Sequence, residues 1–283
     1  MKKANKVRLN TLFAFFILFL FYYYKNKIMK IAIIGAGNMG GAIARGLLSQ
    51  TNQAVEIAIS NPSTPKLESI QKKYPKAKCY TSNQEAVDKA QLVILAVKPW
   101  LIEKVLSELK FNSTPIIASV AAGINFKQLA SWTSESASLY RIIPNTAISI
   151  RESMTIISSF QNHTEEDNLL LSLFNELGTT LLLPEEKMAA ATSVASCGIA
   201  FFFKHIQASM QAGVELGLTP KEAMQLAAQA AIGAGLLLND SNKHPSTEID
   251  KVTTPGGKTI KGINQLDEKG FTNALIQAIK ASI

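Results

Sequence analysis

The sequence has few of the residues on which metal and redox sites depend. It holds two cysteines, Cys79 and Cys197, and three histidines, His163, His205 and His244, among 283 residues. The cysteines match no zinc or redox spacing, and the histidines are too scattered to form an imidazole-based metal site. We therefore predict no metal site, and thiols that stay reduced in a cytoplasmic protein.

Charged residues are also scarce, at 18% of the chain against 47% hydrophobic residues. Such a composition can build a large core and excludes a disordered chain. The net charge of +8 comes mainly from residues 1–28, which hold six basic residues and no acidic one. The remaining 23 basic and 21 acidic residues nearly balance, and no basic run is interleaved with aromatics. This pattern argues against a nucleic-acid partner.

Residues 1–28 contain an apolar stretch from Thr11 to Tyr24 behind a basic leader. It is short for a membrane span, which needs about 20 residues, and no small-residue cleavage site follows it. A membrane anchor, a signal sequence and upstream sequence that is not normally translated stay open as alternatives. We favour the last, because Met29 directly precedes the first predicted strand. Residues 1–28 are therefore expected to lie outside the fold, and no membrane association is expected.

Strands and helices alternate over residues 29–183. Apolar, β-branched runs predict strands at Lys30–Ile34, Val55–Ile59, Leu92–Val97, Pro115–Val120, Ser138–Ile142, Met154–Ser158 and Thr180–Leu183. Helical spacing predicts helices at Asn38–Leu48, at Leu67–Lys73, from Pro99 onward and at Glu165–Leu177. Alternation at these intervals predicts a Rossmann-type domain, an α/β fold with a parallel, doubly wound sheet.

Residues 184–283 are rich in alanine and predict an all-α second domain. Gly217 is expected to end one helix, and Thr219-Pro220-Lys221-Glu222 to begin the next with a capping box. The helix Glu222–Leu238 is apolar almost all round, so it must be buried on most sides. We predict that it is buried in an intertwined homodimer; burial within a single subunit is the alternative.

A glycine-rich motif, Gly35-Ala36-Gly37-Asn38-Met39-Gly40, follows the first predicted strand and opens a helix. This is the context in which a GxGxxG pattern binds a dinucleotide. Gly35 permits the tight turn, Gly37 lets the pyrophosphate approach the backbone, and Gly40 allows close helix–strand packing. The helix N-terminus supplies amides and a dipole for the phosphates.

The end of the second strand distinguishes the two nicotinamide cofactors. A carboxylate there would bond the ribose hydroxyl of NADH, whereas this chain has Ser60-Asn61-Pro62-Ser63, with Lys66 nearby. NADPH is therefore favoured, with NADH as the alternative. Two further segments, Ala96-Val97-Lys98-Pro99 and Arg141–Thr146, are expected at the same carboxyl edge of the sheet.

In the second domain, Thr253-Thr254-Pro255-Gly256-Gly257-Lys258-Thr259 contains a GGKT sequence. Val252 stands where a P-loop has its first glycine, and no strand precedes it, so a nucleoside-triphosphate site is not indicated. A Pro-Gly-Gly turn before a helix instead offers backbone amides to a small anion such as a carboxylate. A plain turn at the start of a helix is the alternative.

Taken together, these motifs resemble the pyrroline-5-carboxylate reductase family. The resemblance runs in order through IGAGNMGGAIARGL, AVKPW, VAAGI, RIIPNTA and VTTPGGKTIKGINQLDEKG. It implies a Rossmann domain joined to a helical dimerisation domain, dimers that assemble further into rings, and reduction of a cyclic imine to L-proline. Hydride transfer would depend mainly on orientation and proximity, which suits a chain without a catalytic dyad.

The resemblance also implies a set of site residues. Besides the glycine motif, positions that resemble the family's NADP contacts are Ser60, Asn83, Val97, Lys98 and Ala122. The substrate carboxylate would lie on the turn that includes Thr254, Gly256, Gly257 and Lys258, with the catalytic Thr259 hydroxyl near the ring nitrogen. Glu186 matches an acidic family position at the start of the helical domain.

Two departures from the family pattern bear on the substrate. Ser196-Cys197-Gly198-Ile199-Ala200 replaces a Gly-Ser-Gly-Pro-Ala stretch, and Ala189 replaces a neighbouring aspartate. Lys258 stands where the family's Ser-Pro-Gly-Gly-Thr-Thr has threonine, which is a milder change. These departures leave open a related imine or keto reductase, or an NADPH-binding regulatory protein that has lost catalysis. A hydroxyacid dehydrogenase is disfavoured, because Lys204 is its only candidate lysine and lacks the expected asparagine.

Overall fold

The computed structural model describes residues 28–49, 55–161, 163–241 and 243–283. The apolar stretch Thr11–Tyr24 and its three alternatives lie outside the described residues. By its internal contacts the chain divides into two compact units, with the division after Ser196. The predicted boundary between residues 183 and 184 stays a prediction, and each unit is described by itself.

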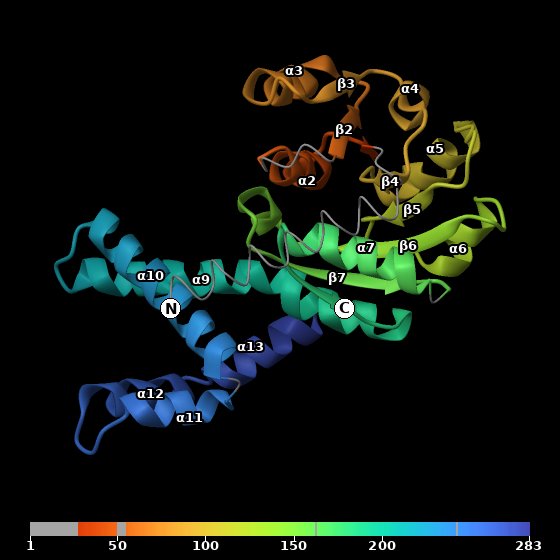
Figure 1. Cartoon of the computed structure of the whole chain (residues 1–283). Coiled ribbons are helices and arrows are strands. Elements are labelled where there is room, and N and C mark those ends of the chain that lie inside the picture. Colours follow the sequence, from red (N-terminus) through yellow and green to blue (C-terminus); the bar gives the residue numbers. More distant parts are fainter. Residues whose placement is uncertain (1–27, 50–54, 162, 242) are drawn as a thin grey trace. The chain divides into compact units, whose positions relative to one another are not determined.

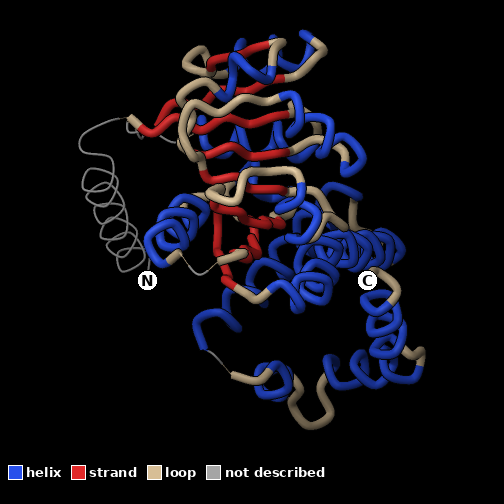
Figure 2. Tube along the Cα trace, turned by 90° about the vertical axis from the view of Figure 1, so that its right-hand side faces the viewer, coloured by secondary structure: helices blue, strands red, loops and turns tan. Residues whose placement is uncertain are grey.

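The first unit is built on one eight-stranded sheet with the strand order β3-β2-β1-β4-β5-β6-β7-β8. The strands are β1 (Met29–Ile34), β2 (Val55–Ser60), β3 (Lys78–Tyr80), β4 (Leu92–Leu95), β5 (Ile116–Ser119), β6 (Ser138–Ile143), β7 (Ser153–Ser159) and β8 (Gly178–Leu182). Figure 2 shows these strands side by side with helices along them. The predicted doubly wound α/β fold is thus confirmed.

Short and medium helices connect the strands. They are α2 (Asn38–Leu48), α3 (Thr64–Lys73), α4 (Asn83–Val87), α5 (Ile102–Glu108), α6 (Phe126–Ser131), α7 (Thr164–Asn175) and α8 (Met188–Ala191). Three 3-10 turns, η1 (Pro99–Leu101), η2 (Thr146–Ile150) and η3 (Glu185–Lys187), lie between them. A π-helical segment, Thr192–Cys197, follows α8, and the division between the units falls before its last residue.

Two hydrophobic clusters cover the two faces of the sheet, as a doubly wound fold requires. One packs the central strands against α2 and α7 and includes Ile43, Leu47 and Phe174. The other packs the opposite face against α4, α5 and α6 and includes Val87, Ile102 and Leu129. Because the central strands β1, β4 and β5 are buried on both faces, their sequences are largely apolar runs.

The strand predictions agree with the structure except in detail. The strand β3 was not predicted, and α3 begins at Thr64, three residues before the predicted start. The neighbouring strands pair in parallel except β6 and β7, which are antiparallel. The chain returns from β6 to β7 through a short connection, which reverses its direction without a crossover helix. Arg141 lies inside β6, so only Pro144 and the residues after it follow that strand.

The second unit is all-α over its described residues, as predicted. Its helices are α9 (Gly198–Glu215), α10 (Pro220–Ser241), α11 (Pro245–Val252), α12 (Lys258–Glu268) and α13 (Phe271–Lys280), labelled in Figure 1. Gly217, with φ +95°, follows the end of α9. The capping box is present: the Thr219 amide donates to Glu222 Oε2 at 2.9 Å, and the Glu222 amide donates to Thr219 Oγ1 at 3.3 Å.

The α10 helix carries a broad apolar surface that the described residues do not cover. Leu226, Ile232, Leu236 and Leu237 are each more than half exposed. The alternative that α10 is buried within one subunit is therefore wrong, since only Ala223 of this helix is buried. Among the described residues, one helical stretch, Glu185–Glu215, is long and apolar enough to span a membrane, which by itself is weak evidence.

Candidate functional site

The carboxyl ends of the parallel strands β1 to β5 lie at one edge of the sheet. This edge brings together the glycine loop after β1, Ser60 and Asn61 at the end of β2, and Ala96–Pro99 after β4. Asn83 begins α4 after β3, and the exposed Ala122 follows β5. Ligands of open α/β sheets bind at this edge.

The three glycines of the loop after β1 have different steric surroundings. Gly35 has φ +105°, and a Cβ there would come within 2.7 Å of the Ala96 carbonyl oxygen. A Cβ on Gly40 would collide with the Gly35 carbonyl oxygen and lie 2.8 Å from the Ala96 Cβ. A Cβ on Gly37 would meet no atom within 4 Å, so the free space there suits a ligand rather than internal packing. A dinucleotide phosphate fits this arrangement.

The helix α2 begins at this loop with an uncapped N-terminus. Gly37 is its N-cap, no side chain caps it, and its first turn contains no acidic residue. The amides of a helix's first turn have no partner within the helix. The Ala36 amide is already engaged, because it donates to Asn61 Oδ1 at 3.1 Å. Free amides and a favourable dipole therefore begin at Asn38 and suit a pyrophosphate.

The end of β2 is held by side-chain hydrogen bonds that the sequence did not reveal. The buried Ser60 hydroxyl donates to Asn83 Oδ1 at 2.7 Å. Asn61 accepts from Ala36 and donates through Nδ2 to the Ser63 carbonyl oxygen at 2.9 Å. These two residues thus shape the loops around the site. Ser63 occupies the N-cap position of α3, but its side chain makes no capping hydrogen bond. The first turn of α3 has no acidic residue.

The segment after β4 lies beside the glycine loop. Ala96 lies close to both glycines, since a Cβ on Gly35 or on Gly40 would come within 3 Å of one of its atoms. Val97 is partly buried against the second hydrophobic cluster. Lys98 is exposed, with its Nζ 5.9 Å from the centre of the Trp100 ring. Lys98 thus adds a positive charge to the edge at which ligands of such sheets bind.

In the second unit, a tight turn precedes α12. The Gly257 amide donates to the Thr254 carbonyl oxygen at 2.9 Å, and Gly256 has φ +69°. A Cβ on Gly257 would lie 2.7 Å from Thr254 Oγ1. The expectation that this turn offers bare amides is thus corrected for Gly257, whose amide is used within the turn. The amides left for an anion begin at Lys258 and the exposed Thr259, in the uncapped first turn of α12.

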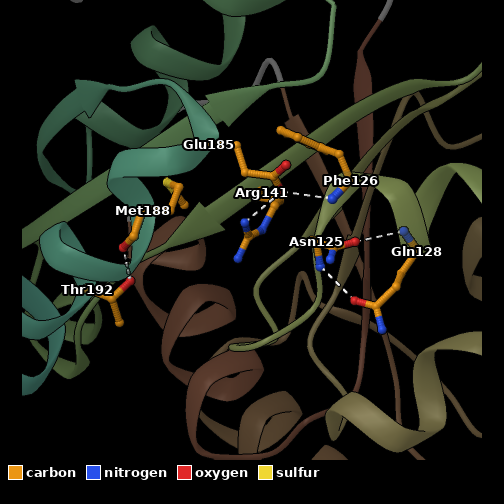
Figure 3. A network of polar contacts seen from close by, with 7 residues as sticks. All are labelled: Asn125, Phe126, Gln128, Arg141, Glu185, Met188 and Thr192. Carbon is orange, nitrogen blue, oxygen red and sulfur yellow. Dashed lines mark hydrogen bonds and ion pairs between the residues drawn. The ribbon is translucent and has the colours of Figure 1, made fainter. Parts of the chain in front are cut away.

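Glu186 is exposed in the short turn η3. Its neighbour Glu185 forms an ion pair with Arg141, with 2.7 Å between Glu185 Oε1 and Arg141 Nη1 (Figure 3). Arg141 belongs to a motif that the sequence predicts at this edge, whereas Glu185 was not predicted. No local pattern links these residues, which lie 44 positions apart.

One buried polar pair joins β6 to α7. The Tyr140 hydroxyl donates to Asp167 Oδ1 at 2.7 Å, and both residues are buried. Burial raises the pKa of the Tyr140 phenol far above its usual range, and the bond to Asp167 raises it further. The phenol therefore stays neutral and serves the fold. Among the described residues, no group of three or more His, Cys, Asp or Glu side chains could hold a metal ion.

The fold and the carboxyl-edge site define a Rossmann-type, dinucleotide-binding oxidoreductase with a helical second domain. Comparisons with known proteins indicate which family within this class the chain belongs to. The family model described as pyrroline-5-carboxylate reductase dimerisation matches residues 185–283. The model described as NADP oxidoreductase, coenzyme F420-dependent, matches residues 30–123.

Two relatives from Dictyostelium discoideum and one solved structure are similar over most of the chain. The chain is 38% identical to pyrroline-5-carboxylate reductase 1, with 89% of the chain and 48% of that protein covered, so it spans about half of that relative. It is 34% identical to pyrroline-5-carboxylate reductase 2, over 89% of the chain and 90% of that protein. The NADP-bound structure of the Plasmodium falciparum reductase is 25% identical, with a TM-score of 0.80 over 90% of this chain and 95% of that one.

The chain therefore belongs to the pyrroline-5-carboxylate reductase family. It is an oxidoreductase that uses a nicotinamide cofactor, and its C-terminal part is a dimerisation domain of this family.

Proposed function

We propose that this chain reduces 1-pyrroline-5-carboxylate to L-proline with NADPH, and that the residues placed above carry out the reaction. The observation that supports this most directly is the combination of an uncapped α2 N-terminus beside Gly37 with a second uncapped helix N-terminus at Lys258 and Thr259. The first suits a pyrophosphate and the second a carboxylate. Membership of the reductase family supplies the reaction.

When bound, NADPH supplies the hydride for the imine carbon of the substrate. The product is L-proline; the imine carbon gains the hydride and the ring nitrogen carries the proton. We infer that Gly35–Gly40 hold the pyrophosphate, and that Ser60, Asn61 and Asn83 shape the loops around the adenosine end. Ala96, Val97, Lys98, Pro99 and Ala122 line the remaining cofactor edge in this proposal.

The substrate carboxylate is proposed to accept hydrogen bonds from the amides at the start of α12. Thr254, Gly256 and Gly257 form the turn that aims those amides, and Lys258 adds a positive charge. The Thr259 hydroxyl is placed near the ring nitrogen, where it orients the imine and hydrogen-bonds the protonated nitrogen. Glu186 is assigned to the substrate side of the site. Catalysis then comes from orientation and proximity, with no strong enzymic acid.

Two finer assignments belong to the same proposal. NADPH is preferred over NADH, because no carboxylate follows β2 and the uncapped start of α3 with Lys66 suits a phosphate. We further propose a cytoplasmic homodimer, which assembles into larger rings and does not associate with membranes. The exposed apolar residues of α10 support burial against a second copy.

The test is the initial rate of NADPH oxidation by the full-length chain with 1-pyrroline-5-carboxylate, compared with Thr259→Ala and Thr259→Ser. Saturable turnover is expected, with a loss of about 10²-fold or more in Thr259→Ala, the range for one positioned hydrogen bond in a transition state, and partial recovery in Thr259→Ser. NADPH binding without turnover in the unaltered chain would contradict the proposed reaction. It would point to a regulatory protein, or to another substrate selected by the altered segment Ser196–Ala200.

A further inference from the structure

One carboxylate oxygen joins three segments of the first unit (Figure 3). Glu185 Oε1 accepts a hydrogen bond from Arg141 Nη1 on β6 at 2.7 Å. The same oxygen accepts one from the Phe126 backbone amide, at the start of α6, at 2.8 Å. Glu185 itself begins the turn η3, where the match to the dimerisation family also starts. The carboxylate thus links β6, α6 and the entry to the dimerisation segment.

Arg141 depends on this carboxylate for its charge partner. Its side chain is only 12% exposed, against 34% for Glu185. Its Nε is buried and makes no hydrogen bond to another described residue. Ser158 lies opposite Arg141 across the β6–β7 pair. Its hydroxyl is buried and likewise makes no hydrogen bond to a described residue. Removing Glu185 would therefore leave a largely buried guanidinium without an ion-pair partner among the described residues, which is costly.

The start of α6 is where the loop after β5 is anchored. Asn125 and Gln128 form a reciprocal capping box. The Phe126 ring is buried and contacts the Phe160 ring at a centroid distance of 5.3 Å, while the Phe126 amide donates to Glu185. The loop itself, residues 120–125, contains the exposed Ala122 and leads from β5 to this anchor. The bond to Glu185 is thus one of three contacts that hold the far end of this loop, beside the capping box and the buried Phe126 ring.

We propose that Glu185 is a positioning residue for the cofactor loop, held in place by Arg141. It holds the end of the loop of residues 120–125, which contains Ala122. This loop is thereby positioned relative to Glu186, which directly follows Glu185 and is assigned above to the substrate side of the site. This rests on the proposed function through the roles given to Ala122 and Glu186. Glu185 itself need touch neither cofactor nor substrate.

The proposal is tested with Glu185→Met and Glu185→Gln in the full-length chain. The dissociation constant of NADPH is measured by fluorescence titration, and KM for NADPH and kcat by steady-state kinetics. We expect Glu185→Met to raise both the dissociation constant and KM about tenfold, which corresponds to about 1.4 kcal/mol, with kcat at saturating NADPH within about twofold. Glu185→Gln keeps an acceptor for the Phe126 amide and should show a smaller rise.

Two controls separate positioning from a general loss of stability. Glu176→Met removes another Arg–Glu pair of this unit, where Arg151 Nη2, after η2, lies 3.6 Å from Glu176 Oε2, after α7. It should leave the NADPH dissociation constant unchanged. Exchanging the charges, with Arg141→Glu and Glu185→Arg together, restores an ion pair but supplies no acceptor for the Phe126 amide. Stability in urea should recover relative to Glu185→Arg alone, while KM for NADPH stays high.

An unchanged NADPH dissociation constant in folded Glu185→Met would overturn the proposal, as would an equal rise in Glu176→Met. The binding titration decides this even if the unaltered chain binds NADPH without turning over 1-pyrroline-5-carboxylate, an outcome that would contradict only the proposed reaction. Failure of the unaltered chain to bind NADPH would overturn both.

Discussion

At the scale of single residues, the glycines after β1 divide between packing and ligand binding. Gly35 and Gly40 are required by the chain itself, because a side chain at either would meet the backbone of the loop or of Ala96. Gly37 has open space around it and a φ of −71°, which any residue can adopt. Glycine thus stands in this motif for two different reasons: close packing of the backbone at Gly35 and Gly40, and room for a ligand at Gly37.

This difference predicts opposite phenotypes for two alanine substitutions. Gly37→Ala should leave the free energy of unfolding within about 0.5 kcal/mol, as at sites free of contacts, but weaken NADPH binding about tenfold or more. Gly40→Ala should lower the free energy of unfolding by about 1–3 kcal/mol through overpacking. Urea unfolding and fluorescence titration of both variants check this. Equal loss of stability in the two variants would contradict the assignment.

The buried pair of Tyr140 and Asp167 yields a pH-dependent prediction. Tyr140→Phe removes the hydrogen bond that the Tyr140 hydroxyl donates to a buried carboxylate oxygen and should cost about 1–3 kcal/mol at pH 8. Burial raises the pKa of Tyr140 in the folded chain above its unfolded value of about 10. The stability that it contributes is therefore fully present below about pH 10 and is lost as the pH rises further.

Urea unfolding of both proteins at pH 8 and above about pH 10 is the measurement. The advantage of the unaltered chain over Tyr140→Phe should shrink at the higher pH. A constant difference would show that the phenol does not titrate on unfolding.

At the scale of elements, the strands with long apolar runs were predictable and the short edge strand was not. β1, β4 and β5 are buried on both faces, so their sequences carry a clear signal. β3 has three residues and begins with an exposed lysine, so nothing local marks it as a strand. The antiparallel direction of β7 depends on pairing with β6, which sequence periodicity does not encode.

The capping box at the start of α10 is an element-scale feature that the sequence did encode. Thr219→Ala should lower the stability of the helical unit by about 1 kcal/mol, because the cap bonds to Glu222 are lost. Thermal unfolding followed by circular dichroism measures this, with the exposed Lys221→Ala as a control that leaves the cap intact. An unchanged midpoint in Thr219→Ala would contradict a stabilising role for the cap.

The candidate site was predictable only in part, because sequence patterns indicate local features but not contacts between residues far apart in the chain. The glycine motif and the turn before α12 are local patterns and could be located from spacing. The bonds from Ser60 to Asn83, from Ala36 to Asn61 and from Arg141 to Glu185 join residues 23, 25 and 44 positions apart. Such pairs follow from the strand order, which brings distant segments to one edge, and no residue type announces them.

At the scale of the whole molecule, the exposed apolar surface of α10 accords with the match to a dimerisation family. An exposed apolar surface of this kind marks an interaction site. Leu236, which is 62% exposed in the single chain, is a direct probe. Leu236→Glu should be harmless in a monomer but should dissociate a dimer that buries this residue.

Sedimentation velocity of Leu236→Glu, with Lys221→Glu as a surface control, measures the outcome. We expect a shift to the monomer in Leu236→Glu alone. A dimer that persists in Leu236→Glu would mean that this part of α10 lies outside the interface.

The proposed reaction transfers a hydride from NADPH to the imine carbon of 1-pyrroline-5-carboxylate. It is tested most directly by incubating the full-length chain with the substrate and NADPH deuterated at C4 in the transferred position, and analysing the product by mass spectrometry. We expect L-proline with a single deuterium on the former imine carbon, and no labelled proline when NADPH or protein is omitted. Oxidation of NADPH without labelled proline would contradict it.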